Sequence, residues 1–254
     1  MNTLSIVIPI YNEEKRLTTT FQALDELKLP NGIKLNEVIF VNDGSNDKTL
    51  SMLKNYQKTS KKVINIISYK DNKGKGFAVK KGMLSAKADY ALLCDADMST
   101  PLSELKKFSS PIQKGVHVII GTRKNGKSTV IVHQPKIREY LGRVFTLITQ
   151  IVLGVPVTDF TCGFKLFSHA SIPLIFTESK INRWGYDAEI IYLALKKNLS
   201  LVECPVEWSD NKGTHVQVMQ AIPQTIFELF KIHYIHTVIP FVGSLKPILV
   251  RISA

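Results

Sequence analysis

The stretch that decides the fold is Leu4-Ser5-Ile6-Val7-Ile8-Pro9-Ile10-Tyr11-Asn12-Glu13. The run from Leu4 to Ile8 is almost wholly apolar, as is typical of a strand buried on both faces of a parallel sheet. Three polar side chains follow at the point where this strand is expected to end. In α/β sheets, ligands bind at the carboxyl ends of the strands. The stretch therefore predicts both a parallel sheet and one part of a binding site.

The same pattern recurs through the first ~120 residues, and alternation of strands and helices is typical of a parallel sheet covered on both faces. Further strands are expected at Val38–Val41, Val63–Ile67, Tyr90–Cys94 and Val116–Ile120. Helices are expected at Glu13–Leu27, from Ser45-Asn46-Asp47 through Tyr56, at Gly76–Ser85, and from Thr100 with Pro101 at its first position. Polar clusters follow the strands at Asn42-Asp43-Gly44, Asp71–Gly76, Asp95-Ala96-Asp97 and Gly121-Thr122-Arg123. The sequence thus predicts a Rossmann-like α/β fold with a site at one edge of its sheet.

The second half of the chain is less regular. The spacing predicts an amphipathic, basic helix at Lys136–Leu153, a short strand at Gly163–Phe167, a helix at Tyr186–Lys196 and an edge strand at Leu199–Trp208. We assign the last of these to an edge because Pro205 has no amide hydrogen to donate. From Gln217 onward the pattern is apolar and helical. We therefore divide the chain into one domain at 1–216 and an amphipathic segment at 217–254.

Composition narrows the partners. The chain has 254 residues, a net charge of +12 and 44% hydrophobic residues, which indicate a globular protein that binds anions. Its three cysteines are far apart and are expected to be reduced thiols, not a disulfide framework or a zinc site. We expect no signal peptide and no membrane-spanning helix. Nucleic acid is disfavoured because aromatic residues do not alternate with the basic clusters.

The pair Asp95 and Asp97 carries the chemistry of the expected site. Carboxylates at i and i+2 share a face of an extended chain, and hard divalent cations prefer such ligands together with diphosphate oxygens. Mg²⁺ or Mn²⁺ held there would neutralise a departing nucleotide diphosphate. A strand-end turn that caps the next helix is the alternative. Two interpretations also stay open for Asp43. Its carboxylate could accept hydrogen bonds from a base or ribose, or it could belong to a tight turn that caps the next helix.

Several motifs in order resemble the inverting glycosyltransferases of family 2, which have the GT-A fold. They are Ile6–Glu13, Val41–Ser45, Asp71–Gly76 and Asp95-Ala96-Asp97, joined downstream by Gly121-Thr122-Arg123, Asp159–Phe167 and Trp184–Glu189. The downstream motifs are similar to those of dolichyl-phosphate β-glucosyltransferases and less close to dolichyl-phosphate mannose synthases. The resemblance runs from about Leu4 to about Val218, so it implies a GT-A fold for almost the whole chain.

The resemblance implies a role for each matching residue. The residues expected to bind the nucleotide sugar are Pro9, Tyr11, Asn12, Glu13, Asp43, Asp71, Lys75, Asp95 and Ala96. Those expected to bind the metal are Asp95 and Asp97, and the expected catalytic residues are Asp97, Arg123, Asp159 and Asp187. Those expected to bind the acceptor phosphate are Arg138, Arg143 and His215. Trp184 is expected to help shape the sugar and acceptor side. We expect no counterpart here of the N-terminal membrane span that the eukaryotic relatives carry, and His215 stands where their motif has a stronger cation.

The implied activity is metal-dependent, inverting transfer of a hexose, in the first place glucose from UDP-glucose, to a polyprenyl phosphate. The expected location is the cytoplasmic face of a membrane, with peripheral attachment through the basic helix and the apolar C-terminal segment. An acceptor hydroxyl on a glycan or protein stays open as the alternative. That reaction needs a general base, for which Asp159 and Asp187 are the candidates.

Overall fold

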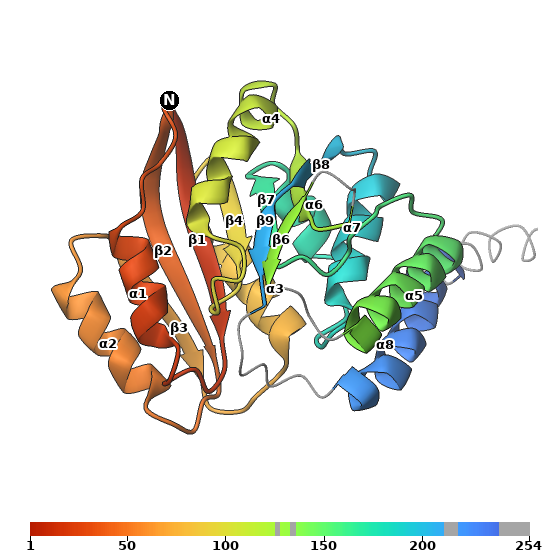
Figure 1. The fold of residues 1–254 in the computed structure, drawn as a ribbon, viewed down its shortest axis with the longest axis horizontal. Coiled ribbons are helices and arrows are strands. Elements are labelled where there is room, and N and C mark those ends of the chain that lie inside the picture. The colour runs from red at the N-terminus through yellow and green to blue at the C-terminus, as the bar shows by residue number, and fades with distance from the viewer. Residues whose placement is uncertain (125–127, 133–135, 211–217, 239–254) are drawn as a thin grey trace, which may run out of the picture.

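The computed structural model describes residues 1–124, 128–132, 136–210 and 218–238, apart from the side chains of Lys136, Arg138 and residues 218–223. Its centre is a seven-stranded sheet in the order β3-β2-β1-β4-β7-β5-β8 (Figure 1). In that order the strands are Ile64–Tyr69, Ile33–Asp43, Asn2–Ile10, Tyr90–Cys94, Phe164–Ser168, Val118–Thr122 and Leu201–Pro205. All neighbouring pairs are parallel except those of β7, which runs antiparallel to both β4 and β5. The mostly parallel sheet predicted from the sequence is confirmed.

Helices cover both faces of this sheet. They are α1 (Leu17–Asp25), α2 (Thr49–Thr59), α3 (Lys75–Ser85), α4 (Ser109–Gln113), α5 (Lys136–Leu153), α6 (Ser171–Phe176), α7 (Tyr186–Lys196) and α8 (Val218–His233). A 3₁₀ helix at Leu102–Phe108 precedes α4, and a π-helical turn at Tyr234–Val238 follows α8. The strands β6 (Thr129–Val132) and β9 (Glu207–Ser209) form a separate parallel pair.

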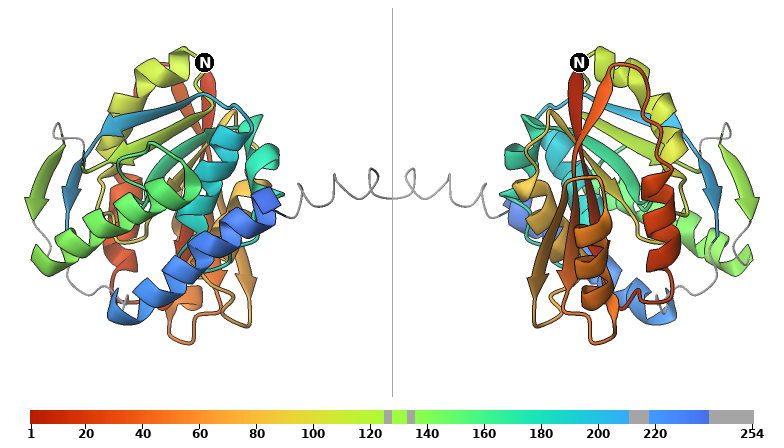
Figure 2. Two further views of the ribbon diagram at one scale, coloured as in Figure 1. Left: turned by 90° about the vertical axis from the view of Figure 1, so that its right-hand side faces the viewer. Right: turned by 90° about the vertical axis from the view of Figure 1, so that its left-hand side faces the viewer.

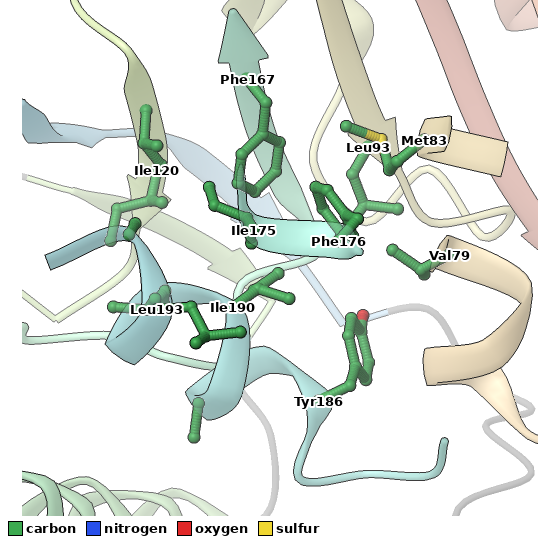
Figure 3. Close-up of a cluster of buried hydrophobic side chains, with 14 of the residues drawn as sticks. Val79, Met83, Leu93, Ile120, Phe167, Ile175, Phe176, Tyr186, Ile190 and Leu193 are labelled. Carbon is green, nitrogen blue, oxygen red and sulfur yellow. The ribbon is translucent and has the colours of Figure 1, made fainter. Parts of the chain in front are cut away.

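Two apolar clusters lie on opposite faces of the sheet, because successive side chains of a strand point to opposite faces. Along β1, Ile6 and Ile8 pack with α1, α2 and the 3₁₀ helix, whereas Val7 packs with α3, α6 and α7. The second cluster is shown in Figure 3, where Phe167 of β7 meets Phe176 of α6, their ring centroids 5.1 Å apart. The strands β1, β4 and β5 are therefore buried on both sides, as their continuous apolar sequences predict, whereas the edge strand β3 is partly exposed.

Some boundaries differ from those expected. The first helix begins at Leu17, four residues after Glu13, because residues 13–16 form a turn that is hydrogen-bonded to the loop after β2. Pro101 precedes its helix in an extended conformation instead of occupying the first helical position. The expected strand at Leu199–Trp208 is divided around Val206 into β8, which is an edge strand of the main sheet, and β9.

The helices α5 and α8 pack against each other at the side of the molecule (Figures 1 and 2). Large apolar side chains are exposed on the outer faces of both, namely Ile137, Tyr140, Leu147 and Ile151 on α5 and Phe227 and Phe230 on α8, with Tyr234 just beyond. We call this set the α5–α8 apolar surface. Within the described ranges, no helix is long and apolar enough to cross a bilayer. The three cysteines are buried free thiols, as expected.

Gly82 allows α3 to lie directly on the sheet. A Cβ at this position would lie 2.4 Å from Val7 Cγ1 and 2.9 Å from Val41 Cγ2. We expect Gly82→Ala to lower the free energy of unfolding by about 1–3 kcal/mol, since overpacking outweighs the gain in helix propensity. Urea denaturation measures the change. The control Leu84→Ala, on the exposed side of α3, should stay within about 0.5 kcal/mol, and a Gly82→Ala variant as stable as this control would contradict the packing.

Candidate active site

One cleft of about 1120 Å³ lies at the carboxyl ends of β1, β2, β4 and β5. Asp43, Asp95 and Asp97 all line it, although Asp43 is the last residue of β2 whereas Asp95 and Asp97 follow β4. The nucleotide-sugar residues predicted from the sequence that also line it are Pro9, Tyr11, Glu13, Lys75 and Ala96. Arg123, just after β5, lines it as well, as do Arg143, Trp184 and Asp187 from the second half of the chain. The structure therefore brings most of the predicted residues into a single cavity.

Asp43 holds the loop that follows β3. Its buried carboxylate accepts hydrogen bonds from the Asn72 side chain at 2.9 Å and from the backbone amides of Lys73 at 2.8 Å and Gly74 at 2.9 Å. Gly44 is required beside it, because it has a φ of +70° and a Cβ there would lie 2.6 Å from the Asn72 nitrogen. Asp71 is exposed and is not among the residues that line the cleft. The loop Asp71–Gly76 therefore contributes to the cleft through residues 72, 74 and 75 and through its backbone, and not through the Asp71 side chain.

The loop after β1 is fastened to the loop after β2. The Asn12 amide donates to Ser45 Oγ at 2.9 Å, and Asn12 Oδ1 accepts from the Asn46 amide at 2.9 Å. Asn12 has a positive φ of 53° and does not line the cleft. Its contacts instead hold Tyr11, which is 41% exposed, at the cleft wall. Beyond it, Glu13 forms an ion pair with Arg16, and both side chains reach the cleft.

Asp95 lies between a cation and a glycine. Lys75 Nζ is 2.7 Å from Asp95 Oδ1, and although burial opposes the charge of Lys75, Asp95 holds its pKa well above the ordinary value. On the other side, a Cβ at Gly163 would lie 1.9 Å from Asp95 Oδ2. The carboxylate is therefore fixed between α3 and the residues before β7.

Asp95 and Asp97 together suit a divalent cation that completes its shell with substrate oxygens. Mg²⁺ is commonly held by one or two carboxylates plus phosphate oxygens. Among the described residues, no group of three or more His, Cys, Asp or Glu side chains is arranged to hold a metal. Two carboxylates in an open cleft, with Lys75 beside one of them, match a site that a diphosphate would complete. Asp97 also receives the Ser99 amide at 3.0 Å, which fixes its turn.

Asp159 supports Arg123 from behind. Its carboxylate is fully buried and accepts from Arg123 Nε at 2.7 Å, Arg123 NH2 at 2.9 Å and the Arg123 amide at 3.0 Å. Burial opposes its ionisation, but Arg123 outweighs burial and holds the pKa of Asp159 well below the ordinary value. The guanidinium also lies 5.2 Å from the Trp208 ring centroid. Asp159 therefore orients Arg123, while only Arg123 faces the cleft.

Asp187 is likewise paired, with a lysine inside the sheet. Lys165 of β7 is fully buried, and its ammonium lies 2.5 Å from Asp187 Oδ1 and 2.6 Å from the Cys162 carbonyl oxygen. One buried cation thus joins the residues before β7 to the first turn of α7. Both carboxylates proposed from the sequence as general bases are engaged with cations.

The expected acceptor-phosphate residues are distributed unevenly. Arg143 on α5 lines the cleft. Arg138 falls within α5, but its side chain lies outside the described set, and His215 lies outside the described residues altogether. Lys124 adds a cation to this side, since Nζ donates to Thr146 Oγ1 at 2.8 Å and to the Gly142 carbonyl at 3.0 Å. Burial lowers its pKa.

Sequence reasoning missed four cations: Arg16, Lys124, Lys165 and Arg183. Three of them line the cleft, and Lys165 lies beneath it. A signal existed for Lys165, because a lysine between Phe164 and Leu166 in a buried strand needs a buried partner. For Arg183 the signal was its place next to Trp184. Arg16 and Lys124 carry no comparable signal.

The ion pair of Asp159 predicts a pH-dependent stability. Because the folded-state pKa is depressed, its contribution is present above the ordinary pKa near 3.8 and is lost as pH falls through the folded value. At pH 7 we expect Asp159→Asn to reduce the free energy of unfolding by on the order of 3 kcal/mol, since a buried charge loses its partner. The deficit should be constant above about pH 5 and shrink below about pH 4.

Denaturation curves from pH 3 to pH 7 measure that deficit. The matched control is Asp25→Asn, because Asp25 pairs with Lys62 at 3.5 Å with 56% of its side chain exposed. That control should change stability by less than about 0.5 kcal/mol. A deficit for Asp159→Asn that grows on acidification would show that the sign of the pKa shift is wrong.

Similarity to known proteins identifies the family of the chain. The family model "Glycosyl transferase family 2" matches residues 5–176. The dolichyl-phosphate beta-glucosyltransferase of Dictyostelium discoideum is 30% identical over 91% of this chain and 74% of its own. The Saccharomyces cerevisiae enzyme of that name is 32% identical over 83% of this chain and 68% of its own.

Among solved structures, glucosyl-3-phosphoglycerate synthase from Mycobacterium tuberculosis, in complex with Mn²⁺, UDP and glucosyl-3-phosphoglycerate, superimposes with a TM-score of 0.66. It is 15% identical, and the match covers 92% of this chain and 79% of that one. At this identity the likeness establishes the GT-A fold alone. With the family-model match and the curated relatives, the chain is a glycosyltransferase and belongs to glycosyl transferase family 2.

Proposed function

We propose that this glycosyltransferase transfers a hexose, most readily glucose from UDP-glucose, to a polyprenyl phosphate of the dolichyl type with inversion at the anomeric carbon. The observation that carries the proposal is the single cleft in which Asp43, Asp95 and Asp97 meet Lys75, Arg123 and Arg143. A glucosyl donor and a dolichyl phosphate acceptor are taken from the names of the relatives in Dictyostelium and yeast. UDP is the nucleotide bound in the solved structure of the mycobacterial synthase.

The donor fits the half of the cleft built by β1, β2 and β4. Asp43 and the backbone of Asn72–Gly74 form a polar wall suited to a nucleoside, with Tyr11 at its edge. Lys75 and Arg123 are the cations nearest Asp95 and Asp159, so they are suited to the diphosphate. The polar wall followed by two cations therefore suits a nucleoside diphosphate that carries a sugar.

Asp95 and Asp97 would hold Mg²⁺ or Mn²⁺ together with the diphosphate. The metal supplies charge neutralisation on the leaving group when bound. The chain's own contribution is to keep the two carboxylates fixed. Gly163 does this for Asp95, because no larger residue fits against that carboxylate.

The acceptor side favours a phosphate over a hydroxyl. An acceptor hydroxyl has to lose a proton to a general base, but Asp159 is held by Arg123 and Asp187 by Lys165. A phosphate monoester is already largely ionised at pH 7, with a second pKa of about 6, so it needs orientation by cations instead of a base. Arg143 and Lys124 at the α5 side of the cleft are placed to orient it.

Access for a lipid-borne acceptor is supported by the α5–α8 apolar surface. Arg143 lines the cleft from α5, the same helix whose outer face exposes Ile137 and Ile151, at 71% and 73%. An amphipathic helix with an apolar outer face and basic flanks binds at the interface of an anionic membrane. We therefore place the reaction at a membrane surface, on the cytoplasmic side, where buried free thiols stay reduced.

The test is a radiolabelled donor panel with the full chain. UDP-glucose, GDP-mannose and UDP-N-acetylglucosamine are each offered with dolichyl phosphate or dolichol in detergent micelles, with Mg²⁺, Mn²⁺ or EDTA. We expect label from UDP-glucose in the lipid extract with dolichyl phosphate only. Asp97→Asn would weaken the neutralisation of the leaving diphosphate by the metal. We therefore expect it to lower the rate by on the order of 100-fold, where each factor of ten is about 1.4 kcal/mol in activation free energy.

Two outcomes contradict the proposal. Label on dolichol would favour a hydroxyl acceptor. Label on a sugar, with none in the lipid extract, would favour it as well. Full activity of Asp97→Asn in EDTA would remove the metal from the reaction.

Gly163→Ala should reduce transfer by moving Asp95, since a displacement of about 1 Å at a reacting centre costs on the order of 100-fold in rate. The matched control is the double-mutant cycle with Asp95→Ala. In that background Gly163→Ala should cost little more, because the side chain with which it clashes is gone. Equal losses in both backgrounds would show that Gly163 acts through something other than Asp95.

A further inference from the structure

The segment from Thr177 to Gly185, between α6 and α7, brings Arg183 and Trp184 to the cleft. It lies against the start of α3. The Phe77 amide donates to the Asn182 carbonyl at 3.1 Å. A Cβ at Gly74 would lie 2.5 Å from that same carbonyl oxygen, and one at Gly76 would lie 2.5 Å from the Ile181 carbonyl oxygen. The segment therefore touches the loop that Asp43 holds.

Glu189 of α7 fixes the first part of this segment. It is fully buried and accepts from the amides of Lys180 at 2.9 Å and Ile181 at 2.8 Å. Its third partner is His236 in the π-helical turn after α8, with Nε2 at 2.7 Å. The residues next to the cleft are thus connected to the end of α8.

Glu228 of α8 fixes the last part. Its side chain is buried, and Oε2 accepts from the Gly185 amide at 2.7 Å. Gly185 precedes the first turn of α7, so the carboxylate satisfies an amide that the helix leaves without a partner. The fit is close, because a Cβ at Gly185 would lie 2.8 Å from both Cβ and Oε2 of Glu228.

The helix α8 therefore has two different faces. Leu229 and Ile232 are buried on the inner face beside Glu228, while Phe227 and Phe230 are exposed on the outer face. Figure 2 shows α8 at the side of the molecule, next to α5. The helix α8, which is far in sequence from Asp43, Asp95 and Asp97, thus supports the segment that carries Trp184.

We propose that Glu228 is a positioning residue, which holds the segment Lys180–Gly185 so that Arg183 and Trp184 stay in the donor-binding cleft. The role of the cleft as a donor site rests on the proposed function. The hydrogen bond from Gly185 does not, so the position of Trp184 can be tested without any turnover.

The first experiment measures the position of Trp184 directly. The chain has two tryptophans, so Trp208→Phe leaves Trp184 as the only tryptophan fluorophore. In that background we expect Glu228→Ala to raise acrylamide quenching about twofold and to shift the emission to the red. Glu228→Gln keeps an acceptor for the Gly185 amide and should restore the original values. The matched control is Gln224→Ala, because exposed Gln224 donates to Glu228 Oε1, at 3.3 Å, and not to the Oε2 atom that accepts from the Gly185 amide.

The second experiment uses the otherwise unaltered chain and measures transfer kinetics and the binding of UDP with Mn²⁺. We expect Glu228→Ala to raise the KM for UDP-glucose and the Kd for UDP about tenfold, with kcat changed less than threefold. Loss of binding common to ground state and transition state gives this pattern. Glu228→Gln should return both constants to within about twofold of the original chain.

Thermal melting separates positioning from unfolding. If Glu228→Ala does not fold, Glu228→Asp, which is shorter by one methylene, takes its place with the same expectations. Unchanged Trp184 quenching and unchanged UDP affinity in a folded variant would overturn the proposal. If the original chain transfers no glucose, the proposed function fails, whereas the quenching result still decides the role of Glu228.

Discussion

The direction of β7 is the constraint on which the site depends. β7 runs antiparallel between β4 and β5, so it begins at the edge of the sheet where they end. Its first residue, Phe164, pairs with Cys94, the residue before Asp95. The preceding residues must therefore lie beside the tips of both neighbours, which is where Gly163 meets Asp95 and Asp159 meets Arg123. With a parallel β7, those residues would lie at the far edge.

Charge balance in the cleft follows from this arrangement. Asp95, Asp159 and Asp187 each have a cation beside them, from α3, from the end of β5 and from β7 respectively. Buried carboxylates are costly without such partners. Each of these three carboxylates therefore lies in an ion pair that fixes its position beside the cleft.

Much of the sheet was predictable because its strands are continuous apolar runs that end in polar clusters. The residues Asp43, Asp95 and Asp97 were assigned to one site from that rule alone, and they do share a cleft. The direction of β7 was not predictable, since a strand of five residues has the same pattern in either direction. The partnership of Asp159 with Arg123 and that of Asp187 with Lys165 depend on this direction. For that reason the sequence left both acids as candidate bases.

The strand order also bears on how the chain folds. β3, β2, β1 and β4 pair with one another and come from the first 94 residues, whereas β5 pairs only with β7 and β8 among the described strands. The half of the sheet formed by β1–β4 can therefore assemble from contacts that are closer in sequence, which form quickly. We expect the other half to join it when β7 pairs with both β4 and β5. Hydrogen exchange of the amides in β5 and β8 should then report an opening that the β1–β4 half does not share.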